Sequence, residues 1–219
     1  YFDHIHRYLP ALMLREGYEV AFLPVNHRHR QTGQSKYTNL GRLWAYTISA
    51  TPTAVAGLNP FDTRTKGAGS GAQILGRPLV RIEGGTPFVY VVTSNGYLFK
   101  VNATDGTQPW GAPALLLVTA TTVSTTPAVF NTGDSSLPAQ DFVFVGAGDG
   151  TNAYLYKVRA SDGVLADTSI SLGTDTKSSP AVGAGSVYIG VTGGADGVLR
   201  LNPVDLEILT NLAAGKTAS

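Results

Sequence analysis

The chain has 219 residues, of which 43% are hydrophobic and only 14% are charged, with 26 Gly, 12 Pro and no Cys. This length allows one large or two small domains with a sizeable core, and the scarcity of charge together with abundant Gly is typical of a loop-rich, all-β protein. The net charge of +1 argues against nucleic-acid binding, the lack of Cys excludes disulfides and thiolate sites, and no apolar stretch approaches the ~20 residues of a membrane-spanning helix.

The first 44 residues differ from the rest of the chain. They carry six basic and three acidic residues and all four His, but only three of the Gly. The remainder carries 10 basic and 12 acidic residues, so a basic segment and a slightly acidic one cancel. We therefore predict a segment over residues 1–46, a linker or irregular strand region over 47–73, and a repeat region over 74–219. Because the chain starts at Tyr1 without a signal-peptide pattern, we expect it to be a processed or excised piece.

The basic segment is predicted to be a short α/β unit. Apolar residues at helical spacing indicate a helix over 5–13, and residues 20–25 indicate a strand before a polar loop. Residues 6–12 read H-R-Y-L-P-A-L, and residues 33–37 read G-Q-S-K-Y. This stretch resembles the end of the catalytic domain of bacterial polyisoprenyl-phosphate glycosyltransferases, relatives of dolichol-phosphate mannose synthase.

That resemblance implies phosphate contacts from Arg28, Arg30, Ser35 and Lys36, and contact with a lipid phosphate at the cytoplasmic face of a membrane. Glycosyltransferases of this kind hold their metal through an upstream D-x-D motif, which the sequence lacks. One interpretation of the chain is therefore a fragment of a membrane-associated glycosyltransferase that is inactive alone.

Four residues are candidates for metal ligands. His27 and His29 form a His-x-His pair, which on a strand places both imidazoles on one face, as zinc requires. Asp149 and Asp196 could belong to calcium loops. The alternatives are that His27 belongs to the glycosyltransferase pattern and that both Asp-Gly pairs form hairpin turns, so we predict no metal site.

Three similar segments follow one another between residues 74 and 210. Each begins with a proline, at positions 78, 127 and 180, and the spacings of 49 and 53 residues match the length of a propeller blade. An alternating Val, Tyr and Phe stretch follows each proline and predicts strands, and a Gly or Asp turn then leads to another strand.

These segments resemble the PQQ-like, or quinoprotein-like, β-propeller repeat. Residues 179–182 read S-P-A-V and residues 185–190 read G-S-V-Y-I-G, which match the first half of that repeat, and residues 102–110 match the second half. The resemblance implies that Gly106 and Trp110 dock one blade against a neighbour. Asp167 and Thr210 stand at the tryptophan position of the later repeats, so regular docking is not expected there.

The predicted fold is mainly β: a partial or assembly-completed β-propeller with about three recognisable four-stranded blades, preceded by the short α/β segment. Because propellers close with about four to eight blades, a protein partner or further blades would have to complete the ring. We predict no catalytic residues, no cofactor and no nucleic-acid partner, although some propellers of this class hold PQQ with Ca²⁺.

Two functional hypotheses follow. The first is a non-catalytic binding or scaffold module that is periplasmic or extracellular. The alternative is the glycosyltransferase fragment, the one enzyme class that the sequence suggests. Since these two families belong to different compartments, a chimeric origin with a junction near residues 44–50 is a third explanation for the abrupt change in composition.

Overall fold

The structure is a computed structural model, which describes residues 42–43, 61–116, 123–131, 141–149, 151–176, 178–194 and 197–212. Contacts divide the chain into two compact units, residues 1–36 and 37–219, and every described residue belongs to the second. This division falls before the predicted boundary at residue 46. Strand β1 (Arg42–Leu43) pairs with β2 (Phe61–Asp62), so that part of the predicted basic segment belongs to the second unit.

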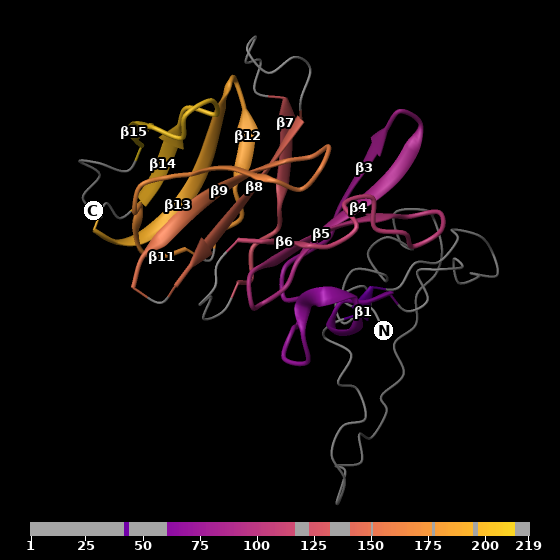
Figure 1. The fold of residues 1–219 in the computed structure, drawn as a ribbon. Helices are drawn as coiled ribbons and strands as arrows, with labels where there is room; N and C mark the ends of the chain where they lie inside the picture. The colour runs from indigo at the N-terminus through magenta and orange to yellow at the C-terminus, as the bar shows by residue number, and fades with distance from the viewer. Residues whose placement is uncertain are drawn as a thin grey trace, which may run out of the picture. The chain divides into compact units, whose positions relative to one another are not determined.

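The prediction of a mainly β protein is confirmed. Twelve of the fifteen described strands form three consecutive groups of four, which we call repeats 1 to 3, and neighbouring strands within each repeat are antiparallel (Figure 1). Repeat 1 consists of β3 (Leu79–Glu83), β4 (Thr86–Val92), β5 (Tyr97–Asn102) and β6 (Ala114–Leu115). Repeat 2 consists of β7 (Ala128–Asn131), β8 (Asp141–Gly148), β9 (Ala153–Arg159) and β10 (Leu165–Thr168). Repeat 3 consists of β12 (Ala181–Gly183), β13 (Ser186–Gly194), β14 (Gly197–Leu201) and β15 (Ile208–Asn211).

One further strand connects the last two repeats. Strand β11 (Gly173–Asp175) pairs with β9 of repeat 2 and with β13 of repeat 3, which joins both into one nine-stranded sheet. Gly173 lies at this junction, where an added Cβ would come within 2.7 Å of the Thr192 carbonyl oxygen. A glycine is therefore required for the two repeats to approach each other here.

The residues of the central strands explain why the repeats stack. Strand β4 has buried residues at consecutive positions from Val89 to Val92, and β8 is buried continuously from Phe142 to Gly148. Successive side chains of a strand point to opposite faces of its sheet, so a continuous apolar run must be covered on both faces. Strands β4 and β8 therefore require a packing partner on each side.

Three hydrophobic clusters provide this cover. One lies between repeats 1 and 2 and includes Tyr90 and Val143, and a second lies between repeats 2 and 3 and includes Phe144 and Ile189. The third buries the remaining face of repeat 1 against the segment 61–74. Within that segment Phe61 packs edge-to-face on Phe99, with ring centroids 5.9 Å apart.

The described part of the predicted linker is thus a covering layer for repeat 1. Its short helical turn, Arg64–Ala68, is tied to repeat 1 because the Asn95 side-chain amide donates to the Ala68 carbonyl at 2.7 Å. In the described ranges, no helix has the length and apolar character needed to cross a membrane.

Candidate functional site

The site is built from the face that each repeat turns toward the next one, which we call the forward face. The strand register places one aromatic residue of the second strand opposite one cationic residue of the third strand in every repeat. The pairs are Tyr90 with Lys100, Phe144 with Lys157, and Tyr188 with Arg200. A second equivalent position on the same face lies two residues before the cation on each third strand. It is occupied by Leu98, Leu155 and Val198.

The lysines of the first two repeats hold the following repeat by the same contact. Lys100 Nζ donates to the Ala160 carbonyl of repeat 2 at 2.9 Å, and Lys157 Nζ donates to the Val204 carbonyl of repeat 3 at 2.6 Å. Each ammonium also lies over an aromatic ring of its own repeat, 4.4 Å from the centroid of Phe88 and 4.3 Å from that of Phe142. Both ammonium groups are buried, and these contacts help to compensate their lost hydration.

Repeat 1 adds a carboxylate to this arrangement. Glu83 accepts from Lys100 Nζ at 2.7 Å and from the Tyr90 hydroxyl, so all three side chains meet at the boundary with repeat 2. Burial raises the pKa of Tyr90 above its ordinary value of 10.0, and its hydrogen bond to the Glu83 carboxylate raises it further. These side chains stabilise the contact between repeats, and an ion pair between Arg81 and Asp141 also joins repeats 1 and 2.

Trp110 packs against repeat 2. Its indole N–H donates to the Ala160 carbonyl at 3.1 Å, and its ring lies so close to Gly163 that an added Cβ there would come within 2.6 Å. Gly163 has a positive φ of 75°, which favours glycine independently of this contact. Gly106, the other predicted docking residue, occupies the same turn position in repeat 1 with φ 74°, and its N–H donates to the Asn102 carbonyl.

Repeat 3 fills the corresponding space in a different way. Leu206 stands at the turn position of Gly106 and Gly163, keeps the positive φ at 59°, and buries its side chain to 1% exposure in the cluster between repeats 2 and 3. The later repeats lack the tryptophan, as their sequences show at Asp167 and Thr210. A leucine from the following repeat therefore supplies apolar volume to the second boundary.

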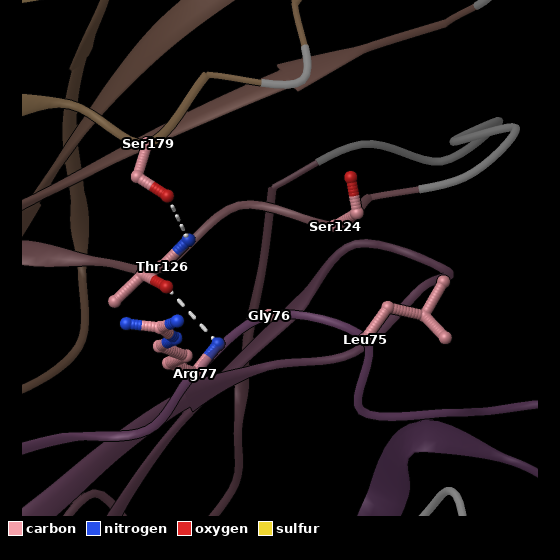
Figure 2. Close-up of a pocket in the computed structure, with 6 residues that line it drawn as sticks. All are labelled: Leu75, Gly76, Arg77, Ser124, Thr126 and Ser179. Atoms are coloured by element: carbon pink, nitrogen blue, oxygen red, sulfur yellow. Dashed lines mark hydrogen bonds between the residues drawn. The ribbon is translucent and has the colours of Figure 1, made fainter. Parts of the chain in front are cut away.

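The residues before the three prolines form a hydrogen-bonded ladder across the repeats. The Arg77 N–H donates to Thr126 Oγ1 at 3.0 Å, and the Thr126 N–H donates to Ser179 Oγ at 2.8 Å (Figure 2). The ladder lines a shallow cavity of about 450 Å³, completed by Leu75, Gly76 and Ser124. Within the residues that the structure describes, the ladder ends at Ser179.

The predicted metal and phosphate residues divide between described and undescribed parts of the chain. Asp149 lies in the turn after β8, where one carboxylate oxygen accepts the N–H groups of Thr151 and Asn152 at 2.8 and 2.7 Å. These hydrogen bonds lower the pKa of Asp149 and give its carboxylate a role in the turn. Outside the described residues lie Asp196, His27, His29, Arg28, Arg30, Ser35 and Lys36. The described side chains form no group of three or more His, Asp or Glu that could hold a metal ion.

The forward face of repeat 3 differs from the other two in exposure. Tyr90, Leu98, Phe144 and Leu155 are fully buried by the following repeat. In repeat 3, Val198 is 42% exposed and Tyr188 and Arg200 are half-buried. Arg200 Nε donates to Ser186 Oγ of its own repeat at 2.9 Å, whereas Lys100 and Lys157 donate to the next repeat.

Residue-level reasoning from the sequence missed the two lysines, Leu206 and the ladder. A signal for the lysines was present, because Lys100 and Lys157 stand at one position of aligned repeats, each after three largely apolar residues. A cation repeated inside an otherwise buried strand indicates a specific acceptor, since an unpaired charge is too costly to bury. The ladder had a weaker signal, the hydroxyl residue before Pro127 and Pro180.

No family model matches the chain, and no curated protein matches it. Among solved structures, the crystal structure of BamB from Moraxella catarrhalis is similar, with a TM-score of 0.45 and 15% sequence identity. The match covers 78% of this chain and 45% of that one, so the chain spans less than half the length of this structural neighbour.

Proposed function

We propose that the chain is a non-catalytic scaffold of β-propeller type that acts by binding another protein. The observation that carries this proposal is the uncovered forward face of repeat 3. Val198 there is 42% exposed, whereas its equivalents Leu98 and Leu155 are fully buried. Val198, Tyr188 and Arg200 thus lie partly open at positions that the preceding repeats bury against their neighbours, and tyrosine and arginine are enriched at protein interfaces.

The use of the polar side chains supports a non-catalytic role. Lys100, Glu83 and Tyr90 form a cluster of titratable groups at the boundary of repeats 1 and 2, and all three bond within or across that boundary. Asp149 bonds to the backbone of its own turn. The resemblance of the repeats to quinoprotein-like propellers supports a location outside the cytoplasm.

Site-specific crosslinking in cells that produce the chain tests the proposal. A photoreactive amino acid replaces Val198 in one variant and Ile82 in the control, because Ile82 is also apolar and is 71% exposed on β3 of repeat 1. We expect one protein to be crosslinked reproducibly from position 198 and not from position 82. Identical products from both positions, or none from position 198, would contradict the proposal.

A further inference from the structure

We infer that the cavity lined by the hydroxyl ladder binds a small aliphatic monocarboxylate, that is, a carboxylate group that carries a short apolar chain. The cavity lies between residues 75–77, which lead into repeat 1, and residues 124–126, which lead into repeat 2, and Ser179 completes it. None of these residues belongs to the forward face of repeat 3, so the inference does not depend on the proposed function.

The ladder leaves hydroxyl protons available to a ligand. Thr126 Oγ1 accepts the Arg77 N–H, and Ser179 Oγ accepts the Thr126 N–H. A hydroxyl that accepts a hydrogen bond through its oxygen still carries one O–H donor. Among the described residues, neither of these hydroxyls donates to a protein acceptor, and the Ser124 hydroxyl forms no hydrogen bond. The cavity therefore has three hydroxyl donors that the fold itself does not use.

Arg77 is the only charged residue among the described residues that line the cavity. Its backbone N–H belongs to the ladder, but within the described part of the chain its guanidinium has no hydrogen-bond or ion-pair partner. A guanidinium presents a planar fork of donors that fits a carboxylate. One positive charge with hydroxyl donors, and no carboxylate beside them, favours a singly charged anion over a cation or a doubly charged phosphate.

Leu75 supplies an apolar end to the cavity. Its side chain is 41% exposed, and Figure 2 shows it on the opposite side from the Arg77 guanidinium. An anion held at Arg77 can thus direct an aliphatic chain toward Leu75 and remove apolar surface from water. None of the described lining residues is aromatic, so a flat aromatic ligand gains no stacking contact here. The volume of about 450 Å³ is within the usual range of small-molecule sites.

Backbone contacts hold the two walls of the cavity in place. An added Cβ on Gly76 would collide with the Thr125 carbonyl oxygen, so a glycine is required for the two segments to approach each other. The Thr125 hydroxyl in turn donates to the Gly146 carbonyl at 2.7 Å, which attaches this wall to β8. Because the walls are held before a ligand arrives, little ordering of the protein opposes binding.

NMR of the ¹⁵N-labelled full chain tests the inference, with hexanoate as the probe. We expect saturable shifts of the Arg77 and Thr126 amides, with a dissociation constant on the order of 1 mM for a ligand of this size. Hexanamide has the same apolar chain without the charge and should bind at least ~10-fold more weakly. Inorganic phosphate should shift the same amides but bind more weakly than hexanoate.

Variants separate the charge from the hydroxyls. Arg77→Gln should weaken hexanoate binding by at least ~10-fold, and the backbone N–H of residue 77 keeps its place in the ladder. Arg159→Gln is the matched control, because it removes the same charge at the end of β9, outside the cavity, and should leave binding unchanged. Ser124→Ala removes a hydroxyl that bonds to no other described group, and should weaken binding by ~3-fold in a folded chain.

Four results would overturn the inference. Equal binding of hexanoate and hexanamide would show that the charge is not recognised, and tighter binding of phosphate would replace the carboxylate as ligand. Equal weakening by Arg77→Gln and Arg159→Gln would show that only the overall charge matters. Shifts confined to Val198 and its neighbours, or no saturable shift at all, would show that hexanoate does not occupy the cavity.

Discussion

The boundaries between repeats 1 and 2 and between repeats 2 and 3 are assembled from the same backbone scheme with different side chains. Both have a lysine that donates to a turn carbonyl and a rung of the hydroxyl ladder. The first boundary is completed by Trp110 packing on a glycine, and the second by Leu206 standing at the glycine position. Apolar volume at a repeat boundary can thus come from either partner, provided that the opposite side leaves room.

The largest effect is expected from Trp110→Ala. Removal of a core tryptophan lowers the free energy of unfolding by about 3–5 kcal/mol. Trp110 is only half-buried, but its removal also breaks the hydrogen bond to the Ala160 carbonyl. We therefore expect a loss of about 4 kcal/mol. Urea unfolding measures this loss. Hydrogen exchange should speed up in β4 and β5 before it does in β13 and β14, and uniform acceleration would show that the boundaries are not separate units.

Leu206→Ala is the matching change at the second boundary. Leu206 is 1% exposed, and Leu→Ala in a core costs about 2–5 kcal/mol, so we expect about 3 kcal/mol. Leu206→Gly should be no more destabilising than Leu206→Ala although it removes one more carbon, because glycine tolerates the positive φ of this position. A clearly greater loss with glycine would contradict this account of the backbone.

Gly163→Ala probes the space that the tryptophan requires. The new methyl would lie 2.6 Å from the Trp110 ring at φ 75°, and we expect a loss of about 2 kcal/mol from clash and backbone strain together. Gly111→Ala is the matched control, with the same φ of 75° and no atom within 4 Å of the added Cβ. In a Trp110→Ala background the cost of Gly163→Ala should fall to that of the control, and an unchanged cost would exclude the steric explanation.

The last effect concerns alkaline pH, which should weaken the first boundary selectively. Burial raises the pKa of both Tyr90 and Tyr156, and both belong to the cluster between repeats 1 and 2. Their neutral forms stabilise the fold fully below pH 10.0, and this stability is lost as the pH rises above 10.0, because the unfolded chain ionises first. We expect a loss of at most about 1.4 kcal/mol per pH unit for each tyrosine.

Tyr90→Phe should remove one of these two contributions, although it also loses the hydrogen bond to Glu83. Urea midpoints at pH 8 and 11 measure the difference. Hydrogen exchange of β13 and β14 reports on the second boundary, where Phe144 and Leu199 stand at the positions of Tyr90 and Tyr156. Equal alkaline sensitivity of both boundaries would contradict this assignment.

A good part of this architecture could be predicted from local sequence. Alternating and continuous apolar runs such as residues 88–92 and 142–147 predicted buried strands, because the side-chain period of a strand is a property of the chain itself. Turn residues predicted the hairpins, because Asn-Gly and Asp-Gly pairs tolerate the positive φ of tight turns. The Asn95-Gly96 pair lies in such a turn, with φ 85° at the glycine. The prolines indicated the repeat period.

Other features depended on contacts between segments distant in sequence. The sequence does not say that Lys100 reaches Ala160, sixty residues away, or that Leu206 fills the second boundary, because both depend on how one sheet stacks on the next. The segment 61–74 was predicted as part of a linker because its composition is that of a loop, and its burial follows from the apolar face of β4 and β5. Local periodicity thus determined which strands form, while the stacking of the repeats decided which side chains are buried, which cations are paired and which face remains uncovered.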